Sequence, residues 1–191
     1  MAEFKDRGSK FLAFAYPAKD IDTCKKLLAQ LKKEYGKAVH YCLAYRLGVD
    51  GSTFRVSDNG EPAGSAGRPI LGQIDSKGLT NVIVVVVRYF GGTLLGIPGL
   101  INAYKTATAL ALQLSPIIKK PIEIPYELNF DYHQMNEVMM LVKLYNCSVV
   151  EQTAQLFIQL HIGIPKNRLD EVLEKLGTLR DVTIKTTLKV D

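Results

Sequence analysis

The sequence lacks tryptophan altogether and contains only three cysteines and three histidines among its 191 residues. The cysteines, Cys24, Cys42 and Cys147, are far apart and form no CxxC pair. This spacing argues against a disulfide framework and against a zinc site, and it favours buried, reduced thiols. We therefore expect neither a metal nor another cofactor to organise the fold.

Long hydrophobic runs are also missing. The longest run extends from Val82 to Val87, whereas a membrane-spanning helix needs about 20 apolar residues. The first residues, Met1 to Arg7, are rich in charge and do not resemble an export signal. We therefore expect a cytoplasmic protein without a membrane partner, and its content of 47% hydrophobic and 23% charged residues is typical of a globular chain.

The net charge of +5 is unevenly distributed along the chain. Residues 1–120 contain 17 Lys and Arg against 9 Asp and Glu, a net charge of +8, and residues 121–191 contain 7 against 10, a net charge of −3. This asymmetry indicates two units with different surfaces, and a polyanion such as RNA would meet the first of them. A solvated basic face without a partner is compatible with the same charges.

Hydrophobic periodicity predicts alternating strands and helices in the first 115 residues. Asp20 is a candidate N-cap for an amphipathic helix, and Gly36 is expected to end that helix in the left-handed conformation. The β-branched run at residues 82–90 predicts a central strand that is buried on both faces. Further strands are expected at residues 11–16, 40–47 and 53–56, and further helices near residues 70–74 and 100–114.

A second pattern begins after residues 116–121, a linker with two prolines and a basic pair. Residues 122–191 predict strand, helix, two strands, helix and strand, which is the βαββαβ order of a ferredoxin-like domain. The final strand is expected at residues 182–190, with Ile184, Thr186 and Leu188 in alternation. The whole chain is therefore predicted to be an α+β protein with domains at residues 1–115 and 122–191.

Two glycine-rich segments carry the residues best suited to binding. They are residues 57–71, SDNGEPAGSAGRPIL, and residues 88–104, RYFGGTLLGIPGLINAY. Glycine lets backbone amides approach a ligand closely, and the second segment lies between a strand and a helix, as phosphate-binding loops do. Neither a Walker A motif nor a GxGxxG motif is present, so the sequence argues against a nucleotide-dependent enzyme.

Several residues of the first domain are candidates for binding an anion or a nucleic acid. They are Arg55, Arg68, Arg88, Gly91, Gly92 and Lys105. Two compatible interpretations exist for Arg88 at the end of the central strand. It could present a fixed cation to a phosphate or carboxylate, or it could pair with Asp58 or Glu61 and hold the two glycine-rich loops together.

Other residues are candidates for the loops themselves or for a pocket between them. They are His40, Asp58, Glu61, Ser65, Gly67 and Tyr89. Two carboxylates without an adjacent histidine make a poor transition-metal site, and acceptance of backbone N–H groups is the favoured role for Asp58 and Glu61. Ser65 lies outside a GxSxG elbow and is a better helix N-cap than a nucleophile, so no catalytic residue is expected.

In the two glycine-rich segments and in shorter ones, the chain resembles the IMPACT/YigZ family. The shorter segments are Ser9-Lys10-Phe11, Ala38 with His40, Ala44-Tyr45-Arg46 and Ala103-Tyr104. The chain departs from the usual family residues at Asn59, Ser65, Arg68 and Pro98. Together the matching segments extend over about 100 residues, so the resemblance is specific.

The resemblance implies a fold and a biological context. It implies an N-terminal domain similar to domain IV of elongation factor G, a ribosomal-protein-like fold, and a C-terminal domain similar to domain V of that factor. Eukaryotic members of the family are implied to be translation regulators that bind their protein partner mainly through an additional RWD domain. Because the motifs here begin near Met1, the chain resembles the shorter bacterial form without that domain.

The leading hypothesis is a non-catalytic binding protein that regulates translation. Its basic first domain would bind RNA, the ribosome or translation factors. The alternative is a pocket between the two glycine-rich loops that binds a phosphate or another small molecule, with or without catalysis. A third hypothesis is a protein–protein adaptor that uses the acidic second domain.

Overall fold

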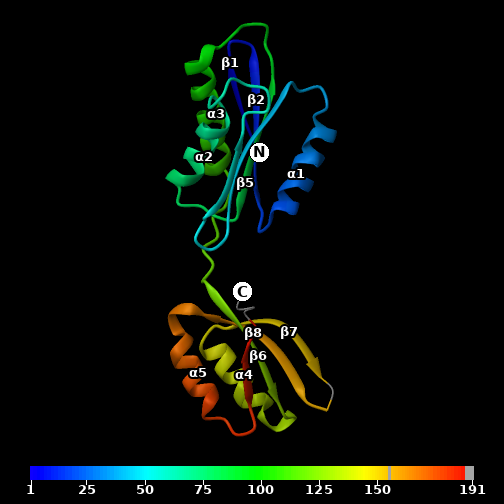
Figure 1. Cartoon of the computed structure of the whole chain (residues 1–191), viewed down its shortest axis with the longest axis vertical. Helices are drawn as coiled ribbons and strands as arrows, with labels where there is room; N and C mark the ends of the chain where they lie inside the picture. Colours follow the sequence, from blue (N-terminus) through cyan, green and yellow to red (C-terminus); the bar gives the residue numbers. More distant parts are fainter. Residues whose placement is uncertain (155, 188–191) are drawn as a thin grey trace. The chain divides into compact units, whose positions relative to one another are not determined.

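The computed structural model describes residues 1–154 and 156–187 and divides the chain into two compact units, Met1–Ile117 and Ile118–Asp191 (Figure 1). Both units combine an antiparallel sheet with helices, so the predicted α+β class is confirmed. Within the described residues, no helix has the length and hydropathy needed to cross a membrane.

The first unit is built on a five-stranded sheet in the order β1-β2-β5-β3-β4. The strands are β1 (Ala2–Asp6), β2 (Ser9–Pro17), β3 (His40–Leu47), β4 (Thr53–Ser57) and β5 (Val82–Tyr89). Every neighbouring pair is antiparallel. The prediction of a buried central strand is confirmed, because β5 lies between β2 and β3 and is buried from Val82 to Arg88. Strand β1 was not predicted, although its exposed Glu3 and Lys5 alternate with more buried residues.

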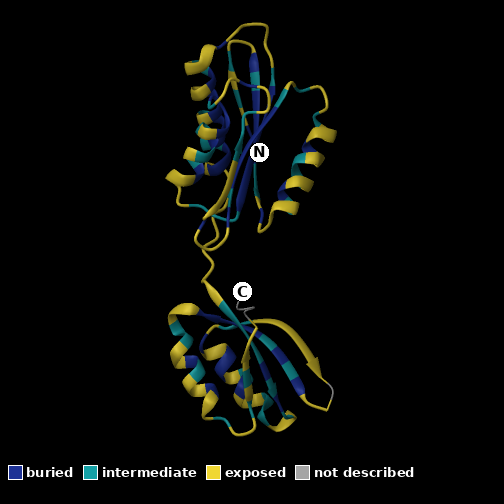
Figure 2. Cartoon of the chain, viewed as in Figure 1, coloured by how far each residue is buried: buried dark blue, intermediate teal, exposed yellow. Residues whose placement is uncertain are grey.

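Helices cover both faces of this sheet (Figure 1). Helix α1 (Ile21–Glu34) packs on one face, and α2 (Gly67–Ser76) and α3 (Gly96–Gln113) pack on the other. Because successive residues of a strand point to opposite faces, Val84 and Val86 contact the core under α2 and α3, while Val85 contacts the core under α1. Burial is accordingly deepest along the sheet (Figure 2).

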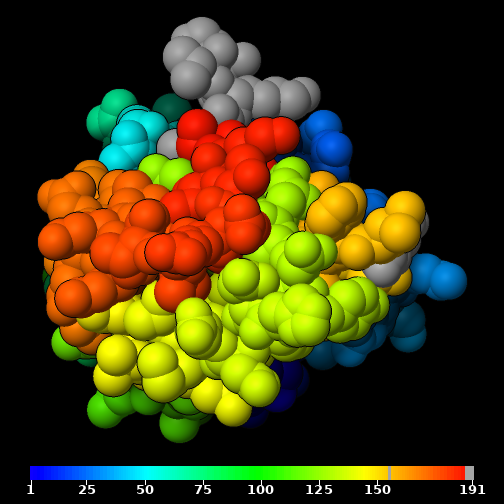
Figure 3. Space-filling model, turned by 90° about the horizontal axis from the view of Figure 1, so that it is seen from below, coloured from blue at the N-terminus to red at the C-terminus, as the bar shows by residue number. Residues whose placement is uncertain are grey.

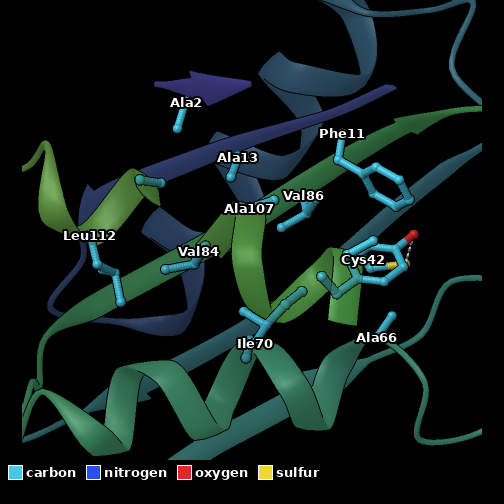
Figure 4. Close-up of a cluster of buried hydrophobic side chains, with 14 of the residues drawn as sticks. Ala2, Phe11, Ala13, Cys42, Ala66, Ile70, Val84, Val86, Ala107 and Leu112 are labelled. Carbon is cyan, nitrogen blue, oxygen red and sulfur yellow. Dashed lines mark hydrogen bonds between the residues drawn. The ribbon is translucent and has the colours of Figure 1, made fainter. Parts of the chain in front are cut away.

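The core under α2 and α3 contains small side chains as well as large ones. Figure 4 shows sheet residues such as Val84 and Val86 meeting helix residues such as Ile70 and Ala107. Three of the buried residues of α3 are alanines, Ala103, Ala107 and Ala111, and their small side chains let the helix backbone approach the sheet closely.

The start of helix α1 was predicted correctly, but its end was not. Asp20 is the N-cap, as expected, and its side chain accepts a hydrogen bond of 2.7 Å from the Thr23 N–H. The prediction that Gly36 ends the helix in the left-handed conformation is wrong. The helix ends instead at Tyr35, which has a φ of −108° and donates its N–H to the Leu31 carbonyl. The chain therefore leaves this helix without needing a positive φ.

The second unit has the βαββαβ order that periodicity predicted. Its elements are β6 (Glu123–Phe130), α4 (Met135–Leu144), β7 (Ser148–Ala154), β8 (Ile158–Pro165), α5 (Leu169–Gly177) and β9 (Thr183–Thr186), with short 3-10 helices at Tyr132–Gln134 and Lys166–Arg168. The strand order is β7-β8-β6-β9, and α4 and α5 share one hydrophobic core with the sheet. Figure 3 shows the surface of this unit, with α5 in orange and β9 in red. Of the expected final strand, residues 188–190 lie outside the described residues.

Candidate functional site: a pocket between the two glycine-rich loops

A buried ion pair joins the two glycine-rich segments. Nη1 of Arg88, at the end of β5, lies 2.7 Å from Oε1 of Glu61 in the β4–α2 loop, and their side chains are only 6% and 3% exposed. Nη2 of Arg88 donates to Ser9 Oγ at 3.2 Å, and the guanidinium lies 5.4 Å from the centre of the Phe11 ring. Arg88 is thus not the free cation that was expected to meet an anionic partner. The geometry matches the other interpretation, in which it holds the two loops together.

The carboxylate of Glu61 has a second donor from the other side. The Tyr104 hydroxyl, on α3, donates to the same Oε1 at 2.7 Å, and Cys42 Sγ lies 3.3 Å from the Tyr104 oxygen. Burial raises the pKa of Tyr104 far above its usual value, and burial raises the pKa of the Cys42 thiol to about 12. Both groups therefore stay protonated at neutral pH. Cys42 is a packed thiol and not a nucleophile, because the thiolate is the reactive form.

Asp58 organises the first loop and the start of α2. Its carboxylate accepts hydrogen bonds from the backbone N–H groups of Gly64 at 2.9 Å, Ala66 at 3.0 Å and Gly67 at 2.8 Å. Burial acts to raise the pKa of Asp58, but these three donors and the nearby Arg68 outweigh it and leave the pKa below its usual value. The carboxylate therefore caps the start of α2, although it lies eight or nine residues earlier in the chain. This agrees with the favoured prediction that Asp58 accepts backbone N–H groups in its loop.

Ser65 and Gly67 contribute packing to this loop. The expectation that Ser65 caps α2 is wrong, because the residue is fully buried and its Oγ donates to the Pro62 carbonyl at 2.7 Å. A Cβ on Gly67 would lie 2.8 Å from the backbone nitrogen of Ser57. Glycine is therefore required where α2 begins against β4, and its role is close approach within the protein.

His40 belongs to the same cluster as the ion pair. Residue 40 starts β3 and pairs with Arg88 across the sheet. Its Nδ1 lies 2.9 Å from the carbonyl oxygen of Asn59, and its Nε2 lies 3.8 Å from Glu61 Oε1. Asn59 has a positive φ of 43° and accepts the Tyr41 N–H through Oδ1 at 2.8 Å. The first loop is thus tied to the start of β3.

The second loop uses its glycines in two different ways. The Gly91 N–H donates to Ser9 Oγ at 3.2 Å, and a Cβ at this position would overlap the backbone of Gly8. The Gly91 amide, which was expected to bind an anion, therefore points into the protein. Gly92 is exposed, has a φ of +84° and has no atom within 4 Å of the place a Cβ would occupy. Its expected contact with an anion stays a prediction.

The two loops enclose a pocket of about 370 Å³, which we call the motif pocket. Its lining consists of Val39, His40, Glu61, Pro62, Arg88, Phe90, Leu94, Leu95, Gly96, Ile97 and Leu100. Three polar side chains and many apolar ones make up this lining, a composition typical of ligand sites. Arg88 Nε is buried and has no hydrogen-bond partner within the described part of the chain. The pocket thus combines a polar base with an apolar rim.

The remaining expected residues do not join this site. Arg55 on β4 pairs with Tyr45 on β3 and lies on the sheet face that α1 covers. Arg68 lies in the first turn of α2 and Lys105 lies on α3, and these two helices cover the opposite face. All three cations are exposed, and the described residues include no ion pair to any of them. Tyr89 packs against the core under α1, away from the pocket.

Sequence reasoning missed the apolar half of the site and two of its buried polar partners. Leu94 and Ile97 are 82% and 54% exposed, although both are large and aliphatic. Apolar residues inside a glycine-rich loop were the available signal, because an exposed apolar patch is more informative than an exposed charge. Ser9 and Tyr104 belong to the shorter segments of the family resemblance, which was the available signal, but neither was named as a site residue.

Metal chemistry has no obvious location in the described residues. They include no group of three or more His, Cys, Asp or Glu side chains that could hold a metal ion. The two carboxylates of the first loop are separated by their different partners, since Asp58 caps α2 and Glu61 pairs with Arg88.

Fold and site together define a class: a two-unit α+β protein whose first unit builds a pocket from two glycine-rich segments. Residues 7–112 match the family model described as the Impact N-terminal domain, which is more than half of the chain. The chain therefore belongs to the IMPACT family, and the resemblance drawn from the motifs is confirmed.

Relatives and solved structures extend this result to both units. The chain is 33% identical to the IMPACT family member YigZ of Escherichia coli over 174 residues, which cover 90% of this chain and 85% of that protein. It is 42% identical to the Protein IMPACT homolog of Saccharomyces cerevisiae over 96 residues, covering 48% of this chain and 36% of that one. A crystal structure of a hypothetical protein superposes with a TM-score of 0.73 at 27% identity, covering 99% of this chain and 93% of the other.

Proposed function

We propose that this chain is a non-catalytic binding protein that takes part in regulating translation and recognises its partner through the motif pocket. One observation carries the proposal. The two segments that carry the family resemblance converge on a single pocket, whose base is a buried ion pair and whose rim is exposed and apolar. A surface of this kind is typical of recognition sites.

The state of the chemically reactive side chains favours binding over catalysis. Cys42 is buried with a pKa raised to about 12, and Tyr104 donates its proton to Glu61. Glu61 is held by Arg88, and the Asp58 carboxylate is occupied by three backbone donors. Each of these groups would have to leave a structural contact before it could act as a nucleophile, acid or base.

Family membership supports the connection to translation. The chain matches bacterial members over most of its length, and it is 38% identical over 98 residues, half of its length, to Protein IMPACT of Rattus norvegicus. The resemblance described above implies that eukaryotic members regulate translation. We also propose that the two units resemble domains IV and V of elongation factor G, which a superposition of each unit on those domains tests.

Docking on RNA or the ribosome is the second candidate function, and a specific observation favours it. Arg55, Arg68 and Lys105 are exposed in a unit whose 117 residues contain 15 Lys and Arg against 9 Asp and Glu. Binding of this kind depends steeply on salt, because phosphate contacts release counterions. The split of the three cations over two faces of the sheet favours the motif pocket as the primary site.

Sedimentation of ribosomes and their bound factors from the native cell tests both candidates. We expect the intact chain to sediment with them. The variant Leu94→Asp should associate at least about tenfold more weakly, and Val49→Asp should associate as the wild type does, because Val49 is also apolar and exposed but lies outside the pocket. Loss caused by Arg68→Glu and by moderate salt, but not by Leu94→Asp, would establish the second candidate instead. Absence of the chain from all translation fractions at low salt would contradict the role in translation.

A further inference from the structure

The rim of the motif pocket exposes more apolar surface than a loop needs. Four of its side chains are exposed although they are large and apolar: Val39 at 57%, Phe90 at 47%, Leu94 at 82% and Ile97 at 54%. They come from three different segments, the approach to β3, the end of β5 and the start of α3. Apolar side chains that gather around one cavity mark a surface that another molecule covers.

The pocket is also held rigid before anything binds. Arg7 donates from Nη2 to the Leu95 carbonyl at 2.9 Å, and Gly91 packs directly against Gly8, so the turn between β1 and β2 fixes the second loop from behind. The ion pair of Arg88 and Glu61 fixes the base. A preformed site costs little ordering on association, which favours a recognition role.

Two exposed cations lie near residues that line the pocket. Lys37 is exposed two residues before Val39, and Arg68 is exposed near Gly64, which follows Pro62 in the first loop. Neither cation forms an ion pair with the described residues. The nearby carboxylates of Asp58 and Glu61 are occupied by backbone amides and by Arg88. The rim therefore attracts a partner that carries negative charge.

The polar base does not attract an anion. Arg88 lines the pocket, but its Nε is buried, and Glu61 pairs with the same guanidinium. A ligand carboxylate or phosphate at the base would be repelled by Glu61. Negative charge on the partner therefore belongs at the rim and not at the base.

We infer that the motif pocket binds an amphipathic, acidic peptide segment of another protein, with aliphatic side chains in the pocket and carboxylates toward Lys37 and Arg68. This inference rests on the proposed function and specifies the partner. RNA is disfavoured, because three of the four exposed rim side chains are aliphatic and offer no aromatic face on which a base stacks. Contact between the first units of two copies is disfavoured, because this unit is basic and like charges oppose the contact.

Selection from a random peptide library displayed on phage, with the full chain as bait, tests the inference. We expect enriched peptides to combine at least two Leu, Ile, Val or Phe residues with a net negative charge. A labelled synthetic copy of the most enriched peptide should bind the chain at least about tenfold more weakly after Leu94→Asp or Ile97→Asp, and equally well after Val49→Asp. Raising the salt from about 0.05 to 0.5 M should weaken binding several-fold, since rim charges are screened.

Other outcomes overturn the inference. Enriched peptides that are basic or uncharged, or whose binding is the same in Leu94→Asp, would place the recognition elsewhere. Concentration-dependent dimerisation that Leu94→Asp abolishes would identify a second copy as the occupant. If no peptide is enriched but ribosome sedimentation is still lost in Leu94→Asp, the peptide inference fails while the proposed function stands. If peptides bind in the pocket but nothing sediments with ribosomes, the role in translation fails instead.

Discussion

The two glycine-rich loops have similar compositions but opposite relations to solvent. The first loop turns its polar groups inward, where Asp58 caps α2 and Glu61 pairs with Arg88. The second loop packs its glycine backbone against the β1–β2 turn and exposes Leu94 and Ile97. The comparison teaches that the charged loop builds the frame and the apolar loop supplies the recognition surface. Substitutions in the two loops should therefore affect different measurements.

The largest expected effect is on the ion pair that joins the loops. Arg88→Ala leaves the Glu61 carboxylate buried without its cation, and breaking a buried pair in this way costs about 3–5 kcal/mol of unfolding free energy. Urea denaturation followed by circular dichroism measures it. The exposed pair of Lys10 and Glu3 offers a control, because Lys10→Ala should change stability little by comparison. Similar losses in both variants would mean that the central pair is not structural.

A smaller loss is expected where the second loop contacts the β1–β2 turn. Gly91→Ala places a Cβ into the backbone of Gly8, and relief of this overlap should cost about 2–3 kcal/mol. Gly72→Ala is the matched control, because Gly72 lies within α2 with open space around its Cβ position. That change should stabilise the protein by about 0.5–1 kcal/mol through helix propensity. Thermal unfolding of the two variants should move in opposite directions.

The cap of α2 comes next in size. Asp58→Ala removes the acceptor for the N–H groups of Gly64, Ala66 and Gly67, and loss of such a cap costs about 1–2 kcal/mol. Asp58→Asn retains one acceptor oxygen and should lose less. Equal unfolding free energies for the wild type and Asp58→Ala would contradict the capping role.

The same carboxylate predicts a pH dependence. Because the pKa of Asp58 is lower in the folded protein than in the unfolded chain, its contribution to stability is fully present above the unfolded pKa of about 4. The contribution is lost as the pH falls through the folded pKa. Denaturation midpoints measured from pH 7 to pH 3 should therefore converge between the wild type and Asp58→Asn at the acidic end. A constant difference across this range would contradict the lowered pKa.

The smallest expected effect on stability is at the rim. Leu94→Asp changes a side chain that is 82% exposed, so the unfolding free energy should stay within about 0.5 kcal/mol of the wild type. The same variant should weaken the partner binding proposed above at least about tenfold, which separates recognition from folding. A large loss of stability would show that Leu94 is a core residue and would remove the contrast between the loops.

Much of the architecture could be predicted from local patterns. The β-branched run predicted β5 at the centre of the sheet, Asp20 predicted the start of α1, and the order of elements after residue 122 predicted the βαββαβ unit. These features depend on a few neighbouring residues. Strand β1 was missed because it has only five residues and Phe4 is its one large apolar residue, so its alternation with Glu3 and Lys5 gives a weak signal.

The site was less predictable, because its residues are distant in the sequence. Arg88 and Glu61 are separated by 27 residues, Tyr104 and Glu61 by 43, and Ser9 and Arg88 by 79. The sequence offered either Asp58 or Glu61 as the partner of Arg88, and the fold selected Glu61 because Asp58 is occupied by the start of α2. The basic residues Arg55 and Lys105 appeared as one set, but strand alternation places Arg55 on the face that α1 covers, and Lys105 lies on α3 over the opposite face.

The sequence by itself determined the family, the α+β class and the positions of the glycines that allow close backbone approach. The tertiary structure decided which charged groups are buried and which apolar groups are exposed. The physical reason is that hydrophobic period and turn chemistry act over a few residues, whereas the burial of an arginine depends on a carboxylate that folding brings to it from another loop.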